Sequence, residues 1–366
     1  MDTSNTKSAK PTKPQTKRNE SHTLPPRWVA SSGTGLSHSQ SSSRKFYMIV
    51  GGWAVLLGMA VAAGMAGPGR QDVLPAPPAG NAFAVEPDSA AEPLADTATV
   101  RLLAEPGNSM PHSFRNAQTN CIIRPEALQP VVCVLARGER PLRVLHIGDS
   151  HVAGKNFPLA VKEELCRCLG EASQADEGSG VWFSYIGKNG ATTQTFLTES
   201  YLGSFAAKMP DLIILSLGTN EAHGMGYRED LHQRQLEAFM KKLRQACPEA
   251  VVLITTPPGD YLTSSYVDYR KMARSKRKVR QVHYAKRPNP MSSRCASCLT
   301  DYAASNGLPC WDLFTICGGE GAAQRNWVAG HYMRPDRVHF EPEGYRLQGR
   351  LLAEALLRAL QPATPA

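Results

Sequence analysis

The sequence predicts an α/β domain, a three-layer sandwich in which a five-stranded parallel sheet lies between helices, preceded by a single transmembrane helix. Two observations predict the sandwich. From about residue 143 short apolar runs alternate with amphipathic helical patterns, and the runs read like strands buried on both faces. A third observation predicts the membrane helix, because residues 46–67 carry no charged side chain. A helix of that length spans about 33 Å, enough to cross a hydrocarbon core of about 30 Å.

The 45 residues before this apolar segment are rich in Ser, Thr, Lys, Pro and Gln. We expect a disordered cytoplasmic tail, because a segment with so few aliphatic side chains cannot offset the entropy cost of ordering. Eight Lys or Arg and two acidic residues give this tail six of the chain's net charge of +9. The basic composition is therefore mostly a property of the tail, and we predict no nucleic-acid partner.

The charges on either side of the apolar segment predict its orientation. Arg44 and Lys45 precede it, and Arg70 is the only basic residue over the next thirty or so positions. The positive-inside rule then places the N-terminus in the cytoplasm and the rest of the chain in the periplasm or outside the cell. The sequence Ala-Val-Ala at residues 60–62 resembles a cleavage site, so a cleaved signal peptide is the alternative. The long tail and long apolar span favour an uncleaved, single-pass anchor in the inner membrane.

The remaining chain divides into a linker and one domain. Residues 68–118 are rich in Pro, Ala, Gly and acidic residues, a composition typical of an extended spacer. Residues 119–361 have the length of one ordinary domain. In chain order its patterns predict a helix at 126–136, a strand at 143–147, a helix at 157–169, strands at 181–186 and 211–217, a helix at 229–245, strands at 250–255 and 308–313, and a helix at 342–360.

These assignments rest on local patterns. Residues 211–217 are almost continuously apolar, whereas residues 229–245 have apolar side chains on one side only. Pro342 suits the first turn of the last helix, and Pro130 weakens the prediction of the first helix. Strands that alternate with helices give a parallel sheet of the flavodoxin-like type. Ligands bind such sheets outside the carboxyl ends of the strands.

Nine cysteines in an exported domain predict disulfide bonds, with at least one thiol left over and the connectivity open. Cys295 and Cys298, together with Cys310 and Cys317, have spacings that a zinc site could use. However, Cys310 falls in a predicted strand and oxidising surroundings favour disulfides. We therefore predict no metal site.

Polar residues gather where the predicted strands end. The first strand runs into Asp149-Ser150-His151, the third runs into Gly218-Thr219-Asn220-Glu221, and Asp336 and His339 precede the last helix. Ser150 would lie on a sharp strand-to-helix turn, which exposes its hydroxyl, and Gly148 suits such a turn. A nucleophilic serine needs a base, a carboxylate to orient the base, and donors for the oxyanion. Separate segments supply residues of each kind.

In order along the chain, four blocks resemble those of the SGNH, or GDSL-type, hydrolases. The blocks are Gly148-Asp149-Ser150, Gly190, Gly218-x-Asn220 and Asp336-x-x-His339. Finer details, such as Gly-Asp-Ser followed by His151, resemble the peptidoglycan O-acetylesterase branch. The extra cysteines, the basic segment 270–287 and the long N-terminal tail depart from that pattern, and they leave the substrate open.

The resemblance implies a role for each matched residue. Ser150 would be the nucleophile, His339 the general base and Asp336 the residue that orients it. The backbone N–H groups of Ser150 and Gly190 and the side-chain amide of Asn220 would form the oxyanion hole. No cofactor or metal is implied. The expected activity is removal of O-acetyl groups from a cell-wall polysaccharide. An O-acetyltransferase with the same triad is an alternative, and a non-catalytic glycan-binding module is another.

Other residues have weaker interpretations. We expect Asp149 to be structural, because adjacent side chains at such a turn rarely meet, and we place His151 and Glu221 in substrate binding at the mouth of the site, with His223 near them. Ser150 could instead be a simple helix cap. Nine of the eighteen residues 270–287 are Lys or Arg. We expect a solvated insertion loop there, which could flank the site and attract anionic glycan or lipid headgroups. The oligomeric state is left open.

Overall fold

A computed structural model describes residues 100–361, apart from residue 225 and residues 272–276. The predicted tail at 1–45, the predicted membrane span at 46–67 and residues 68–99 of the predicted linker lie outside the described residues. Within the described part, no helix has the length and apolar character needed to span a bilayer. The predicted domain boundaries stay predictions.

Five parallel strands form the central sheet, in the order β2-β1-β3-β4-β7. This confirms the predicted five-stranded parallel sheet with flanking helices. The register pairs Gly148 with Gly187 on one side and with Ser216 on the other, so three strands end at the same edge. Their bounds are β1 (Leu142–Gly148), β2 (Val181–Gly187), β3 (Leu212–Ser216), β4 (Val251–Thr255) and β7 (Cys310–Trp311).

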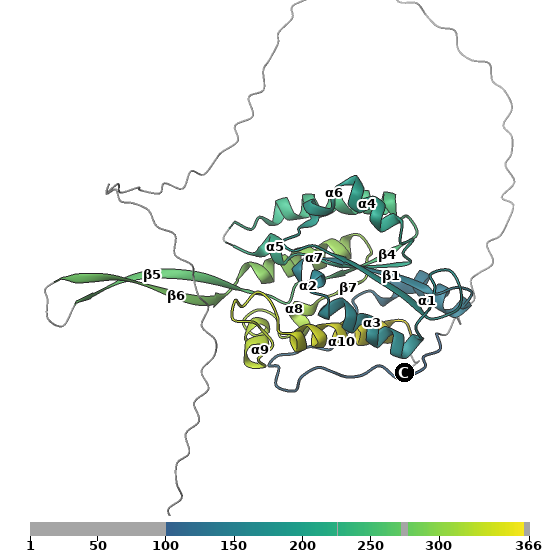
Figure 1. Cartoon of the computed structure of the whole chain (residues 1–366), viewed down its shortest axis with the longest axis horizontal. Helices are drawn as coiled ribbons and strands as arrows, with labels where there is room; N and C mark the ends of the chain where they lie inside the picture. Colours follow the sequence, from purple (N-terminus) through teal and green to yellow (C-terminus); the bar gives the residue numbers. More distant parts are fainter. Residues whose placement is uncertain (1–99, 225, 272–276, 362–366) are drawn as a thin grey trace, which may run out of the picture. The chain divides into compact units, whose positions relative to one another are not determined.

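Helices cover both faces of the sheet (Figure 1). Successive residues of β1 face opposite sides: Val144 joins one hydrophobic cluster and Leu145 the other. The first cluster packs under α1 (Gln129–Arg137), α3 (Asn156–Leu169) and α10 (Pro342–Ala359); the second packs under α4 (Glu199–Ala206), α6 (Glu229–Ala246) and α7 (Met291–Ser305). The short elements are η1 (Pro125–Leu128), α2 (Ser150–Ala153), η2 (Thr193–Phe196), α5 (Thr219–Ala222), α8 (Leu313–Ile316) and α9 (Ala323–Ala329).

Most predicted elements differ from the observed ones by one residue or so at their ends, and two differ by more. The predicted helix at 126–136 is split, with η1 followed by α1, and Pro130 lies in the first turn of α1. A proline is tolerated there because the N–H groups of a first turn have no intrahelical acceptor. The predicted strand at 308–313 is reduced to β7, and Asp312 caps α8 by accepting a hydrogen bond from the Thr315 N–H.

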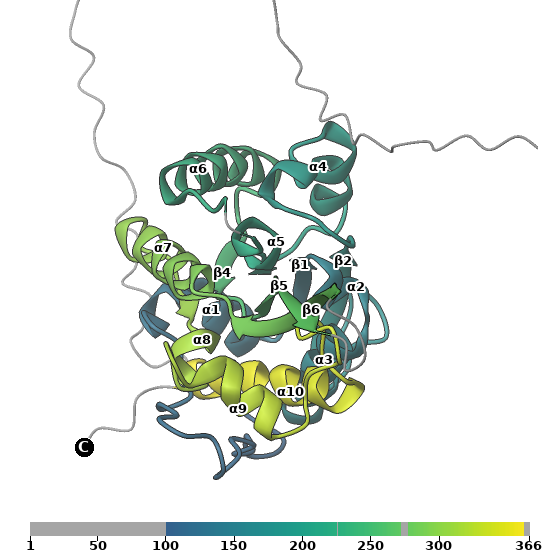
Figure 2. The same ribbon diagram turned by 90° about the vertical axis from the view of Figure 1, so that its left-hand side faces the viewer.

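A two-stranded hairpin replaces the predicted insertion loop. β5 (Tyr261–Lys271) and β6 (Lys278–Pro288) pair antiparallel with each other and with no strand of the central sheet. In Figure 1 the hairpin extends away from the sheet and its helices. Figure 2, turned so that this end of the domain faces the viewer, shows the hairpin nearly end-on, in front of the rest of the domain. The expected solvated loop is therefore an ordered element on the described residues.

The predicted disulfide bonds are not present, because all nine cysteines are free thiols. Six of the nine are buried and pack as small apolar side chains; Cys295 and Cys298, for example, lie on α7 within the domain core. In the described residues no group of His, Cys, Asp and Glu is arranged to hold a metal ion.

Candidate active site

Ser150 is the first residue of α2 and follows β1 after a single intervening residue, Asp149. Two glycines make this tight turn possible. A Cβ on Gly148 would lie 2.3 Å from Val152 Cγ2, and a Cβ on Gly187 would lie 2.3 Å from the Ala153 nitrogen. Because both glycines lack a side chain, α2 packs directly over the ends of β1 and β2. The Ser150 N–H belongs to the first turn of a helix, where N–H groups have no intrahelical acceptor.

Ser150, His339 and Asp336 form one hydrogen-bonded chain. The Ser150 Oγ lies 3.1 Å from His339 Nε2, and His339 Nδ1 lies 2.9 Å from Asp336 Oδ2. A carboxylate only accepts hydrogen bonds, so His339 carries its proton on Nδ1 and Nε2 accepts the serine proton. This is the geometry by which an imidazole activates a serine hydroxyl.

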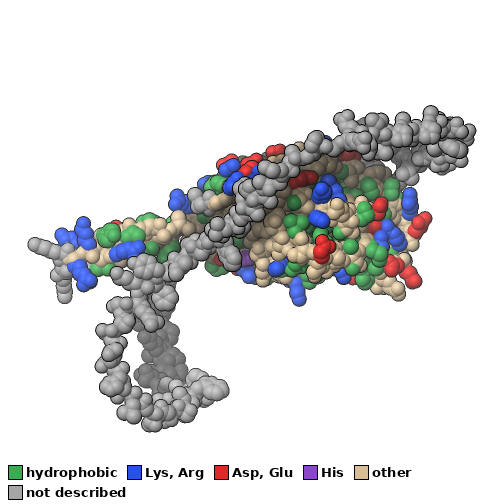
Figure 3. All heavy atoms as spheres, turned by 90° about the horizontal axis from the view of Figure 1, so that it is seen from above, with side chains coloured by type: hydrophobic (Ala, Val, Ile, Leu, Met, Phe, Trp, Pro, Cys, Tyr) green, Lys and Arg blue, Asp and Glu red, His purple; other side chains and the backbone are tan. Residues whose placement is uncertain are grey.

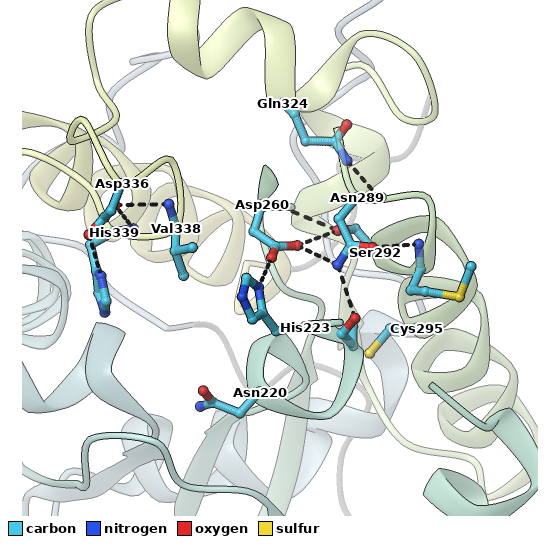
Figure 4. Close-up of polar contacts among 12 residues, drawn as sticks. Asn220, His223, Asp260, Asn289, Ser292, Cys295, Gln324, Asp336, Val338 and His339 are labelled. Carbon is cyan, nitrogen blue, oxygen red and sulfur yellow. Dashed lines mark hydrogen bonds and ion pairs between the residues drawn. The ribbon is translucent and has the colours of Figure 1, made fainter. Parts of the chain in front are cut away.

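Asp336 is held by the loop that follows it. Its Oδ1 accepts hydrogen bonds of 2.9 Å from the backbone N–H groups of Val338 and His339 (Figure 4). Partial burial alone would raise the pKa of Asp336, but these two N–H groups and the His339 ring outweigh it and lower the pKa below its ordinary value. Arg337, at φ +62°, takes the left-handed conformation that turns the loop back on itself, at a cost of about 1–2 kcal/mol for a non-glycine residue.

The predicted oxyanion donors lie beside this chain of residues. Asn220 is on α5, and its Nδ2 donates to the Ala191 carbonyl at 2.9 Å and to Asp149 Oδ2 at 3.3 Å. The first bond ties the amide to the loop that contains Gly190. Gly190 has φ +71° and open space where a Cβ would be. The longer bond, to Asp149, is the one that a substrate oxygen would most easily displace.

Two buried carboxyl groups support this oxyanion region. Burial raises the pKa of Asp149 to about 7, and Asp149 Oδ1 accepts a 2.9 Å hydrogen bond from the His151 N–H. Burial also raises the pKa of Glu221 to about 7, and its carboxyl oxygens accept hydrogen bonds from the N–H groups of Thr193 and Gly218. Asp149 is therefore structural, as expected. Glu221 joins two loops through its carboxyl group, and its role in substrate binding stays a prediction.

His151 differs from its predicted role. It is buried, and its Nδ1 lies 3.1 Å from the Tyr345 hydroxyl. Burial lowers the pKa of His151 to about 4, so the ring is neutral at ordinary pH. The ring centroid is 5.9 Å from that of His339. His151, the second residue of α2, is buried beside the His339 ring and hydrogen-bonds Tyr345 rather than lining an open surface.

A second His–Asp pair lies in the same region (Figure 4). His223, the residue after α5, hydrogen-bonds Asp260 through Nδ1. Asp260 is buried, and its Oδ1 accepts hydrogen bonds of 2.8 Å from the Asn289 amide and the Ser292 hydroxyl. In the described structure no hydrogen bond joins His223 to Ser150. The sequence pointed to His223 but Asp260 was missed, although the position of Asp260 just beyond the carboxyl end of β4 was a usable signal.

The structure thus brings Ser150, Asp336 and His339 together and places Asn220 beside the Gly190 loop. A larger hollow lies elsewhere, between residues 106–133 and the C-terminal end of α10. It contains no serine–histidine pair, and we do not assign the site there.

Comparison with known proteins agrees with this architecture. The profile of the GDSL-like lipase/acylhydrolase family matches residues 146–347. A solved structure described as a peptidoglycan O-acetylesterase is similar at a TM-score of 0.50 and 16% identity, over 64% of this chain and 96% of that chain.

Two further solved structures are similar at lower TM-scores. A lipase/acylhydrolase from Enterococcus faecalis has a TM-score of 0.39 and 20% identity, over 62% of this chain and 100% of that chain. An acetyl xylan esterase, AlAXEase, has a TM-score of 0.38 and 18% identity, over 57% of this chain and 96% of that chain. No curated protein matches significantly. At these identities the structural likenesses concern the fold alone.

Proposed function

The chain belongs to the GDSL-like lipase/acylhydrolase family, and from this premise we propose that it is a serine esterase that removes O-acetyl groups from a cell-wall polysaccharide. Family membership establishes an SGNH-type hydrolase. The observation that carries the proposed chemistry is the hydrogen-bonded chain from Ser150 through His339 to Asp336. Support for the substrate comes from the resemblance to the O-acetylesterase branch and from the similar fold of the peptidoglycan O-acetylesterase.

The first half of the proposed reaction forms an acyl-enzyme. Ser150 Oγ attacks the acetyl carbonyl carbon while His339 Nε2 takes the serine proton, and Asp336 stabilises the resulting imidazolium. The N–H groups of Ser150 and Gly190, with the Asn220 amide, donate to the oxyanion. When the tetrahedral intermediate collapses, the bond from carbon to the sugar oxygen breaks. His339 then returns its proton to that oxygen and the sugar leaves as an alcohol.

The second half restores the enzyme. Water attacks the acetyl-Ser150 carbonyl, and His339 Nε2 takes a proton from the water. The bond to Ser150 Oγ breaks as that proton is delivered to the serine oxygen, and acetate leaves. Each oxyanion donor contributes about 3–4 kcal/mol of transition-state stabilisation in comparable sites. The chain's own side chains thus suffice for every proton transfer in the cycle.

We also propose that the domain acts outside the cytoplasm, held by one N-terminal membrane helix whose linker lets it reach the wall. The support is the sequence: an uncharged span at 46–67, the basic residues before it and the linker composition after it.

The test uses the full-length protein with two substrates, 4-nitrophenyl acetate and O-acetylated peptidoglycan. We expect acetate release from both. Ser150→Ala should reduce it by about 10⁴-fold or more, because the nucleophile is lost while binding persists. Equal rates for the two proteins would overturn the proposed chemistry. Activity on the small ester without release from peptidoglycan would overturn the proposed substrate.

A further inference from the structure

The β5–β6 hairpin presents apolar and aromatic side chains that nothing in the described structure covers. None of the residues of β5 or β6 is buried. Of the ten large hydrophobic side chains that are exposed in the described residues, five lie on the hairpin: Tyr266, Val267, Tyr269, Val279 and Tyr284. A two-stranded hairpin without a packed face is only marginally stable in water. A ribbon of two eleven-residue strands is therefore expected to have a binding partner.

The two faces of the hairpin differ in charge. Side chains alternate along a strand, and directly paired residues share a face. On one face Tyr266 stacks on His283 at a centroid distance of 4.9 Å, and this face also carries the hairpin's acidic residue, Asp268. The other face has no acidic residue. We call it the Lys286 face; from root to tip its pairs are Tyr261 with Pro288, Thr263 with Lys286, Ser265 with Tyr284, Val267 with Val282, Tyr269 with Arg280, and Lys271 with Lys278.

The Lys286 face thus combines two exposed tyrosines with four cationic side chains. Tyr269 is 59% exposed and Tyr284 is 74% exposed. Figure 3 shows Lys and Arg side chains interleaved with hydrophobic ones along the projecting hairpin. At about 3.3 Å per residue the face is roughly 35 Å long. A long, narrow, positively charged surface with aromatic rings suits an extended anionic polymer that has apolar ring faces.

The root of this face is joined to the proposed catalytic loop. Lys286 Nζ donates a hydrogen bond to the carbonyl of Pro335, the residue before Asp336. The Tyr261 N–H donates to the Arg337 carbonyl at 3.0 Å. Both contacts lie within one residue of the carboxylate that orients His339. A polymer lying along the Lys286 face would therefore lead directly to the edge of the site.

We propose that the Lys286 face binds a linear glycan that carries carboxylate groups and guides it to Ser150, an inference that rests on the proposed function. The lysines and arginine would pair with the carboxylates, and the tyrosines would pack on sugar rings. A lipid surface fits less well. Residues 261–288 contain no Trp or Phe, and their one Leu is at the root on the opposite face, whereas interfacial elements rely on Trp, Phe and Leu.

The test neutralises the Lys286 face in the full-length protein. The variant Lys271→Ser/Lys278→Ser/Arg280→Ser should raise the KM for solubilised O-acetylated peptidoglycan strands about tenfold, as three exposed ion pairs imply. It should leave kcat/KM for 4-nitrophenyl acetate unchanged. A matched control, Lys208→Ser/Lys241→Ser/Lys242→Ser, removes three exposed charges near α4 and α6 and should change neither value.

A tyrosine pair separates the two faces. Tyr269→Ser should weaken binding of the strands, whereas Tyr266→Ser, equally exposed but on the opposite face, should not. Binding is measured by co-sedimentation of Ser150→Ala protein with insoluble peptidoglycan, so it does not depend on turnover. Polygalacturonate should compete and neutral dextran should not.

Several outcomes would overturn the inference. The first is that the charge variant has the same KM for the strands as the wild-type protein. Equal losses on strands and on the small ester would show that the hairpin acts on the site rather than on the polymer. If the charge variant still bound the peptidoglycan strands but had lost wild-type binding to phosphatidylglycerol vesicles, the face would be assigned to a membrane. The same result with single-stranded DNA would assign it to a nucleic acid. Inactivity of the wild-type protein on 4-nitrophenyl acetate would count against the proposed function, while the co-sedimentation result would still decide the inference.

Discussion

Two His–Asp pairs lie at the carboxyl edge of the sheet, and they are built in opposite ways. Asp336 is 48% exposed and is held by backbone N–H groups of its own loop, and its histidine reaches Ser150. Asp260 is 3% exposed and is held by side chains from the segment after β6, and its histidine has no hydrogen bond to a serine in the described structure. The pairing of an imidazole with a carboxylate is thus not itself a sign of catalysis. Contact between the imidazole and a nucleophile distinguishes the two pairs.

The position of Asp260 explains what the second pair does. Asp260 directly precedes β5, and Asn289 directly follows β6. The Asn289 side chain donates to Asp260, and the Asn289 N–H donates to the Asp260 carbonyl at 2.9 Å. These contacts close the root of the hairpin. We therefore expect the first pair to govern activity and the second to govern stability.

The largest expected difference is in activity. His339→Gln should lower kcat for 4-nitrophenyl acetate by about 10⁴-fold, because no base then takes the Ser150 proton. His223→Gln should leave kcat within the same order of magnitude, since this ring has no hydrogen bond to the nucleophile in the described structure. Steady-state kinetics on the two purified variants make the comparison. A comparable collapse in both would mean that the two pairs act together in the chemistry.

The next effect is in stability, where we expect the second pair to matter more than the first. Asp260→Ala removes the acceptor of the buried Ser292 hydroxyl and one of the two acceptors of the buried Asn289 amide, which keeps its bond to the Ala222 carbonyl. It should lower the free energy of unfolding by about 3 kcal/mol. Asp336→Ala removes a half-exposed hydrogen bond to His339 and should cost about 1 kcal/mol or less, while activity falls steeply. Denaturant unfolding followed by circular dichroism measures both. Equal losses of stability would remove the distinction between the pairs.

The last effect appears only as pH changes and concerns Asp149, a buried carboxyl whose partners are amides rather than an imidazole. Its pKa of about 7 in the folded protein exceeds the ordinary value of 3.8. The folded state therefore holds a proton that the unfolded state releases, and the stability due to Asp149 falls as pH rises from about 4 to 7. Asp149→Asn removes this dependence. The variant should gain relative to wild type by about 1.4 kcal/mol per pH unit within that window. A pH-independent difference would contradict the raised pKa.

The inner strands β1, β3 and β4 were predictable because they are largely buried and so are mostly apolar. The hairpin was not, because its strands interleave tyrosine and valine with lysine and arginine, and the high charge favoured a loop. Only the β-branched and aromatic residues signalled strands there. The prediction of disulfide bonds was wrong for another reason. The number of cysteines does not show which thiols are buried apart from one another in the core.

The candidate site was predictable where motif order identifies a residue, as for Ser150, Asp336 and His339, which the fold brings into one hydrogen-bonded chain. The role of a residue was not predictable where it depends on the direction in which the side chain points. His151 and Glu221 occupy the expected turns, yet both face inward. Asp260 and His223 are 37 positions apart, and no sequence motif predicts that they are in contact.

The two glycines under α2 have a consequence for anyone who would move this serine to another protein. Gly148 and Gly187 face each other across neighbouring strands, and the helix rests where their side chains would have been. Copying the Gly-Asp-Ser tripeptide alone into a different parallel sheet would set the hydroxyl too high above the strands to meet its histidine. The unit to transplant is the tripeptide together with a glycine on the adjacent strand.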